Sequence, residues 1–590
     1  MEKPQLETTL PTAIDYDLGS TEGSRVQHVR RKLAWSFIPF ALIYLTYFDI
    51  TPRISWANSP VLNYTAQCIQ PDALFPTDTP ELSKAFEFIS SPAFRNASIE
   101  RLSGAVKIKT ETFDDLGAIG EDKRWDVFYG FHEYLEKIFP LVHEKLKVEK
   151  VNTHGLLYTW EGSNPALKPT TLLAHQDTVP VPVDTIPAWD HPPWSGFYDG
   201  QYIWGRGSSD CKNQLIATLE TVELLLSANF SPKRTLLLAY GFDEETFGYH
   251  GAGNLSAVLH SRYGDDGLAV VVDEGASFEE AWGTIFAKPG AAEKGSTNVE
   301  ITVRSPGGHS SIPRDHTSIG ILSELIYLIE STQYPTRLYD ENPYFTQLQC
   351  GAAYSPDFDP KLKKLLNQRL LEGDKDGANG NTCMKKSDAL ALEAAKQGPE
   401  IKYLLQTSQA VDIISGGVKV NALPERAQAI VNHRVNVGET AQAVFDHLTQ
   451  VASHIAKKHN LTLHAFDGIE APSSLILSHN DVLAPAPVTP SLPSTSHHQT
   501  PYSILAGTNR AIYGSHIITT PGIMTGNTDT RFFWDLTKHI FRFAPGYDDE
   551  GGDEGLGNIH TVNERVSVRN HINSVKWFTL FVRNLDEAEL

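Results

Sequence analysis

Three short apolar segments, each ending in acidic or imidazole side chains, constrain the fold of this 590-residue chain more than any other feature. They span residues 170–175, 234–242 and 268–275, and a segment with helical periodicity, 212–228, precedes the second. Strands that are buried on both faces are continuously apolar, and their alternation with helices is typical of a largely parallel sheet. The sequence therefore predicts an α/β fold.

A second pattern begins near residue 296. Strand-like segments, 296–305 and 428–437, alternate there with helix-like segments, 318–332 and 439–459. This alternation predicts a smaller α+β domain inserted into the first. The expected boundaries are 81–295 for the first part of the α/β domain, 296–467 for the inserted domain and 468–590 for the second part of the α/β domain.

The N-terminal region contains an uncharged apolar run at 33–48, which directly follows three basic residues. This asymmetry is typical of a segment whose N-terminal side stays in the cytosol. We therefore predict a cytosolic tail at 1–32, a signal-anchor helix at 33–48, a stalk at 49–80 and a type II single-pass protein whose remainder enters the secretory lumen. The run would span roughly 24 Å as a helix, against about 30 Å for a bilayer core, so a cleaved signal peptide and a buried helix are the alternatives.

Five N-x-[S/T] sequons all follow the predicted anchor, as expected for a luminal chain. They mark candidate glycosylation sites at Asn63, Asn96, Asn229, Asn254 and Asn460. The four cysteines are too few for a dense disulfide framework, and none forms a CxxC pair. Cys350 and Cys383 flank a polar stretch and are candidates for a disulfide in an oxidising lumen.

The charge balance disfavours nucleic acid as a partner. The chain has 71 acidic and 50 basic residues, a net charge of -21. A surface that binds a phosphate backbone must carry the opposite sign.

Side chains suited to metal binding follow the predicted strands, where ligands of α/β sheets collect. Taken singly, each could be a helix cap or a solvated loop residue. Two adjacent glutamates at the end of an apolar strand, however, repel each other unless a cation lies beside them. His175 and Asp177 share a face of their segment, so the carboxylate can reach the ring nitrogen that does not bind a metal. The candidates are His175, Asp177, Asp210, Asp243, Glu244, Glu245, Asp273, Glu274 and His560.

Six ordered motifs, LLAHQDTVPV, WGRGSSDCKN, GFDEETFG, VVDEG, GGHSS and IHTVNE, resemble those of the M20 family of two-zinc metallopeptidases. The resemblance covers most of 81–590 and is strongest to the fungal vacuolar carboxypeptidase S group, the Gly-Xaa carboxypeptidases. It implies a catalytic α/β domain with an inserted lid domain, two Zn²⁺ per subunit and a vacuolar location. It also implies that the lid could pair two chains as a homodimer.

Carried over residue by residue, the resemblance implies that His175 and Asp273 hold one zinc and Glu245 and His560 the other. Asp210 would bridge both ions, with a cis peptide bond after it. The remaining implied roles are a general base at Glu244, an orienting carboxylate at Asp177, an oxyanion-stabilising lid histidine at His309 and substrate contacts from Asn421, Arg434 and Arg531. Arg434 suits a bidentate grip on a free α-carboxylate.

The implied activity is that of a zinc-dependent carboxypeptidase acting on short peptides with a free C-terminal carboxylate. The same machinery could act on N-acyl amino acids, and the sequence does not decide which acyl group is accepted. A non-catalytic, membrane-tethered binding protein on the same fold is the third alternative. A non-catalytic protein of this kind would be expected to lack a metal ligand or the general base, whereas all five ligands and Glu244 are present.

Overall fold

The largest sheet of the computed structural model has eight strands in the order β1-β2-β6-β3-β7-β20-β10-β19. The structure describes residues 63–372, 388–491, 499–548, 550 and 557–590. The central strands β6, β3, β7 and β20 are parallel to one another, as the sequence predicts, and antiparallel pairs flank them. The strands are β1 (Lys147–Val151), β2 (Gly155–Trp160), β3 (Thr170–His175), β6 (Leu236–Gly241), β7 (Val270–Ala276), β10 (Gly290–Glu293), β19 (Gly522–Met524) and β20 (Ile540–Phe543).

Helices cover both faces of this sheet because its central strands alternate between two apolar cores. Leu172 of β3 packs in a core with residues of α6 and α15, whereas its neighbour Leu173 packs in a core with residues of α7. Such strands must be apolar at every position, which is the pattern seen in the sequence. The covering helices are α2 (Pro80–Ile89), α3 (Pro92–Val106), α4 (Val127–Ile138), α5 (Pro140–Lys145), α6 (Lys212–Ser227), α7 (Ala252–Tyr263), α14 (Pro501–Tyr513) and α15 (Val568–Glu587).

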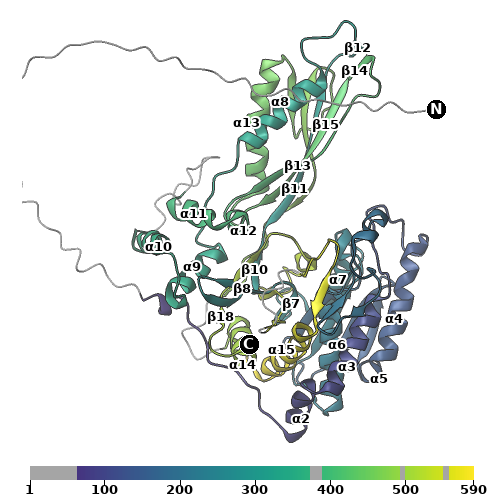
Figure 1. Cartoon of the computed structure of the whole chain (residues 1–590), viewed down its shortest axis with the longest axis vertical. Coiled ribbons are helices and arrows are strands. Elements are labelled where there is room, and N and C mark those ends of the chain that lie inside the picture. The colour runs from purple at the N-terminus through teal and green to yellow at the C-terminus, as the bar shows by residue number, and fades with distance from the viewer. Residues whose placement is uncertain (1–62, 373–387, 492–498, 549, 551–556) are drawn as a thin grey trace, which may run out of the picture. The chain divides into compact units, whose positions relative to one another are not determined.

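A second sheet of five strands, in the order β13-β15-β11-β17-β16, forms the inserted domain. Apolar residues of α8 (Ser318–Ser331) and α13 (Ala441–Lys458) pack with those of its strands (Figure 1). The sheet extends past the predicted boundary at 467, because β17 lies between β11 and β16. Its strands are β11 (Gly295–Arg304), β13 (Ser408–Gly416), β15 (Arg426–Val435), β16 (Thr462–Ala465) and β17 (Ser474–Leu483).

A helical segment inside the predicted lid range packs instead against the large sheet. Its core contains Tyr344 and Leu348 together with Ala292 of β10 and Ile523 of β19. The sequence pattern did not reveal this segment, whose helices are α9 (Pro343–Tyr354), α10 (Pro360–Glu372), α11 (Ala389–Ala394) and α12 (Pro399–Lys402).

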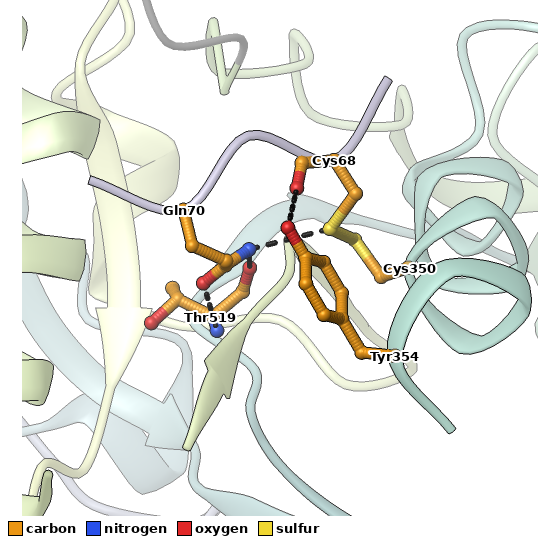
Figure 2. The surroundings of a disulfide bond; sticks show 5 residues. All are labelled: Cys68, Gln70, Cys350, Tyr354 and Thr519. Atoms are coloured by element: carbon orange, nitrogen blue, oxygen red, sulfur yellow. Dashed lines mark hydrogen bonds between the residues drawn. A yellow bond between two sulfur atoms is a disulfide. The ribbon is translucent and has the colours of Figure 1, made fainter. Parts of the chain in front are cut away.

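The end of the predicted stalk is bound to the folded body. Cys68 forms a disulfide with Cys350 of α9, and its carbonyl accepts a hydrogen bond from the Tyr354 hydroxyl at 3.0 Å (Figure 2). Two residues on, the Gln70 side-chain amide exchanges two hydrogen bonds of 2.9 Å with the backbone of Thr519. The predicted stalk is therefore wrong from residue 63 onwards. The predicted pairing of Cys350 with Cys383 is also wrong, because Cys350 already has a partner 282 residues away.

The predicted tail and anchor, 1–32 and 33–48, lie outside the described residues. Within the part of the chain that the structure describes, no helix has the length and apolar character needed to cross a bilayer. The anchor at 33–48 stays a prediction.

Candidate active site

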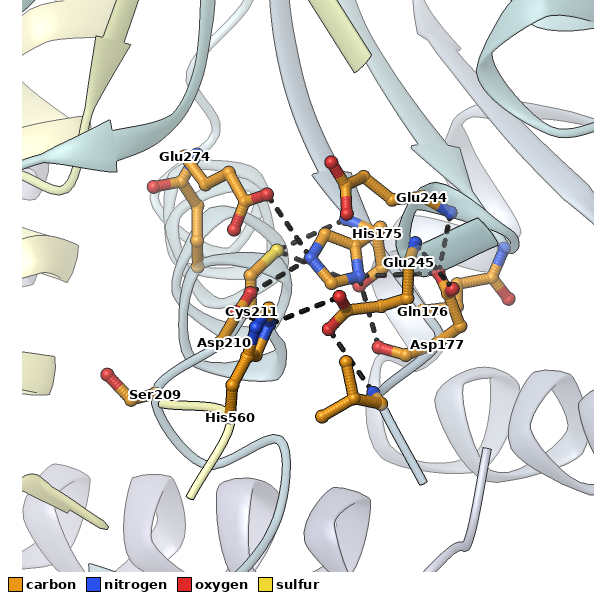
Figure 3. Close-up of polar contacts among 12 residues, drawn as sticks. His175, Gln176, Asp177, Ser209, Asp210, Cys211, Glu244, Glu245, Glu274 and His560 are labelled. Carbon is orange, nitrogen blue, oxygen red and sulfur yellow. Dashed lines mark hydrogen bonds and ion pairs between the residues drawn. The ribbon is translucent and has the colours of Figure 1, made fainter. Parts of the chain in front are cut away.

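The candidate site lies at the carboxyl ends of three neighbouring parallel strands (Figure 3). His175 ends β3, the short helix η5 (Glu244–Thr246) follows β6, and Glu274 lies near the end of β7. Parallel strands present these ends at one edge of the sheet, so the side chains meet although about 100 residues separate the first from the last.

His175 is buried and its two ring nitrogens face different partners. Nδ1 lies 3.0 Å from the backbone carbonyl oxygen of Asp177 and 3.3 Å from its carboxylate. Nε2 points into the cluster, 3.1 Å from Asp210 Oδ1 and 3.3 Å from Glu274 Oε1. A partner at Nδ1 leaves Nε2 available as a metal ligand.

Asp177 also holds the turn that carries the two glutamates. Its carboxylate accepts hydrogen bonds from the backbone N–H groups of Glu244, at 3.2 Å, and Glu245, at 3.1 Å. The Thr112 hydroxyl donates a third, at 2.9 Å. One buried carboxylate thus orients the imidazole of His175 and both glutamate positions.

Asp210 lies between two imidazoles, with one oxygen toward each. Its Oδ1 faces His175, and its Oδ2 lies 3.0 Å from His560 Nε2. His560 in turn lies 3.1 Å from Glu245 Oε2. The peptide bond from Asp210 to Cys211 is cis, as the resemblance implies. A carboxylate placed in this way can bridge two cations.

A buried glutamate that sequence reasoning missed connects the Asp210 loop to the His560 loop. Glu564 Oε1 accepts hydrogen bonds from the backbone N–H groups of Ser209, at 3.0 Å, and Asp210, at 3.2 Å. Its Oε2 forms an ion pair of 2.6 Å with Arg206. The sequence offered one indication of a role for Glu564, its position four residues after His560 in the IHTVNE motif.

The cluster concentrates negative charge out of water. Burial raises the pKa of Glu244 well above its ordinary value, and Glu274 adds to this shift. Burial raises the pKa of Glu274 itself to about 8. Hydrogen bonds to Asp210 and Glu245 raise the pKa of His560 to about 10. Burial opposes the ionisation of Asp210, but hydrogen bonds from His175 and His560 hold its pKa below the ordinary value.

These residues fit a pair of divalent cations. Imidazole nitrogens and carboxylate oxygens are typical ligands of such ions, and a cation relieves the mutual repulsion of the carboxylates. Each of three groups brings its ligand atoms within 4.8 Å of one another. The groups are His175 with Glu244 and Glu245, Asp210 with Glu245 and His560, and His175 with Cys211 and Glu274.

Asp273, the ligand implied by the resemblance, does not join these groups; Glu274 does. Asp273 is buried, and its Oδ1 accepts a hydrogen bond of 2.9 Å from the backbone N–H of Glu274. It lies opposite Arg542 in the pairing of β7 with β20. The register of β7 against β20 shifts directly after Asp273, and the described ion pair of His175 Nε2 is with Glu274 Oε1 at 3.3 Å.

The lid residues His309 and Asn421 lie together, away from the described contacts of the cluster. Both are exposed, on or beside the paired strands β12 (Gly308–His309) and β14 (Ala422–Leu423). The backbone N–H of Ser310 donates to the Asn421 carbonyl at 3.3 Å, and the Ser311 hydroxyl lies 2.7 Å from His309 Nδ1.

The two predicted arginines have different surroundings. Arg434 of β15 donates a hydrogen bond of 2.9 Å to Asn527 Oδ1, and Asn527 donates to the Lys294 carbonyl at 2.6 Å. Asn527 lines the cavity at the cluster, so Arg434 is held next to the site. Arg531 instead donates to the Phe247 carbonyl and lies over the ring of Tyr249. It does not line the cavity.

The sequons differ in accessibility. Asn254 is partly buried, and its side-chain amide donates to the carbonyls of Tyr249 and His250. The exposed candidates are Asn63, Asn96, Asn229 and Asn460.

Comparison with known proteins identifies the family. Residues 171–584 match the model of peptidase family M20/M25/M40. Carboxypeptidase S of Saccharomyces cerevisiae is 40% identical over 515 residues, covering 85% of this chain and 86% of the yeast protein. The human N-fatty-acyl-amino acid synthase/hydrolase is 33% identical over 498 residues, covering 83% and 88%.

A solved structure shows the same fold. The M20 family metallo-carboxypeptidase of Sulfolobus solfataricus aligns with a TM-score of 0.55 and 18% identity, covering 83% of this chain and 99% of the archaeal one. The matched region contains every strand of the large sheet from β3 onwards and all the residues of the cluster. The chain therefore belongs to peptidase family M20/M25/M40 and is a peptidase.

Proposed function

We propose that this protein is a zinc-dependent carboxypeptidase that releases C-terminal residues from short peptides. The observation that carries the proposal is the position of Asp210 between the Nε2 atoms of His175 and His560, with Glu244 and Glu245 beside them. Two Zn²⁺ bound there would supply an activated water and polarise the carbonyl of the substrate. His175 and Glu274 would hold one ion, His560 and Glu245 the other, and Asp210 both.

The chain's own groups perform the remaining tasks. Glu244 removes a proton from the attacking water and returns it to the leaving amine, a role suited to a carboxylate that lies beside His175 and Glu245. Asp177 keeps Glu244 and His175 in position. His309 and Asn421 are assigned to the oxyanion and the substrate by the family resemblance.

Arg434 is the proposed partner of the substrate's C-terminal carboxylate. It is largely buried beside the site, and its described hydrogen bond goes to the neutral oxygen of Asn527. A carboxylate would be a stronger acceptor for the guanidinium than an amide. We assign no such role to Arg531, since its described contacts are to Phe247 and to aromatic rings.

The location of the protein is part of the proposal. A disulfide such as Cys68–Cys350 is typical of an oxidising compartment and supports a lumenal or vacuolar enzyme anchored by 33–48. Glycosylation at the exposed sequons and pairing of two lids are further parts of the same proposal.

The human relative favours a second candidate, hydrolysis of N-acyl amino acids by the same site.

The full-length protein, purified in detergent, should contain two Zn²⁺ per chain and hydrolyse peptides or N-acyl amino acids. Chelation should abolish this activity and added Zn²⁺ should restore it. Glu244→Gln should retain both ions and lose about 10²–10⁴-fold in kcat. If the protein bound no metal and hydrolysed neither class of substrate, the proposal would be refuted and a non-catalytic binding protein would be the remaining alternative.

A further inference from the structure

The cavity that opens from the cluster is uncharged apart from the cluster itself. It has a volume of about 260 Å³, and among its described lining residues the charged or imidazole side chains are only Glu244 and the proposed metal ligands. The remaining wall has a large apolar part, formed by Met524, Ala544, Pro545, Ile559 and Val566.

Three polar side chains of this wall already have protein partners. The Thr528 hydroxyl donates to Glu293 Oε1 at 2.8 Å, and the Ser574 hydroxyl donates to the Asn570 carbonyl at 3.1 Å. Asn213 Oδ1 faces the ring of the buried His571. An anionic group entering this part of the cavity would lose water without gaining a counter-charge, which is costly.

If the protein has the proposed carboxypeptidase function, this distribution of charge determines which end of the substrate enters the cavity. The C-terminal carboxylate needs a cation, and Arg434 provides one at Asn527. The described residues of the cavity wall provide none, so the group that occupies the cavity belongs to the acyl side of the scissile bond.

Gly526 lies on the cavity wall between Met524 and Asn527 and leaves space where a side chain would stand. A Cβ at this position would meet no atom of the described residues within 4 Å, and its φ lies outside the range that favours glycine. The backbone there does not require glycine, so the missing side chain enlarges the cavity.

We infer that the cavity takes an apolar acyl group without a carboxylate and that Gly526 determines the size of the group accepted. Substrates with a second carboxylate on the acyl side are expected to be poor. A side chain at Gly526 would exclude long acyl groups before short ones.

The first test uses zinc-loaded wild-type protein and acyl leucines that share one leaving group. N-pentanoyl-leucine should exceed N-succinyl-leucine in kcat/KM at least tenfold. Equal or reversed rates for this pair would overturn the apolar assignment. Failure of the wild-type protein to hydrolyse any peptide or acyl leucine would instead remove the proposed function on which the inference rests.

The second test is Gly526→Leu, with Gly526→Ala as a milder variant. The ratio of kcat/KM for N-hexanoyl-leucine to that for N-acetyl-leucine should fall at least tenfold with leucine and less with alanine. Gly130→Leu is the matched control, because Gly130 also has open space and an ordinary φ but lies in α4 outside the cavity. It should leave the ratio unchanged. An unchanged ratio in folded, metal-loaded Gly526→Leu, or in Gly526→Ala if leucine prevents folding, would refute the role of Gly526.

Discussion

Replacing Glu564 by glutamine should both destabilise the fold and weaken metal binding. The side chain is fully buried and accepts two backbone N–H groups as well as the ion pair with Arg206, which is itself 3 % exposed. Glutamine keeps the shape but leaves a buried guanidinium without its counter-charge, a loss of about 3–5 kcal/mol. One of the two N–H groups belongs to Asp210, so loss of its orientation should weaken metal binding about 10–100-fold.

The assay combines urea unfolding of the metal-free protein with zinc competition against a chelator. Burial raises the pKa of Glu564 to about 7 although Arg206 opposes the shift, so pH 8 keeps the carboxylate ionised. Adding Arg206→Met to Glu564→Gln should recover part of the lost stability, because both partners of the pair are then gone.

An exposed ion pair serves as the control. Lys168 and Asp266 lie 2.9 Å apart with side chains 45% and 56% exposed, so Lys168→Gln should cost at most about 1 kcal/mol. The reasoning is refuted if Glu564→Gln matches wild type in unfolding midpoint and zinc affinity, or loses no more than the Lys168 variant.

Two further predictions concern the choice of ligand and the response to acid. Glu274→Gln should lower the zinc content measured by elemental analysis toward one ion per chain, whereas Asp273→Asn should retain two, because Glu274 lies 3.3 Å from His175 Nε2 and belongs to a group of ligand atoms with it; the reverse result would restore Asp273 as the ligand. Burial lowers the pKa of His433 in the sheet of the inserted domain to about 4, below the value of about 6.5 expected in the unfolded chain. The unfolded state then binds protons first, so the stability of the inserted domain should fall between about pH 6.5 and 4, by up to about 3 kcal/mol. His433→Asn should reduce this pH dependence in urea titrations, and an unchanged slope would contradict the assignment.

Much of the site could be predicted from the sequence, because its residues lie at or just after the ends of apolar strands. His175 ends one apolar strand and Glu245 follows another by four residues, and the carboxyl ends of parallel strands converge at one edge of a sheet. The alternation of strands and helices likewise predicted β11, α8, β15 and α13 of the inserted domain. These features depend on short-range periodicity, which a sequence displays directly.

The tertiary structure alone decided two kinds of question. One is which residues that lie far apart in the chain contact each other, and the other is which of two chemically similar neighbours enters the site. Asp273 and Glu274 have the same chemistry and adjacent positions, and only the folded structure shows that Glu274 forms the ion pair with His175. Cys350 pairs with Cys68 across 282 residues. The contact between Arg434 and Asn527 joins strand β15 of the second sheet to the loop after β19 of the large sheet. Periodicity carries no information about which distant segments pack together, because that choice depends on the complementary shapes of completed elements.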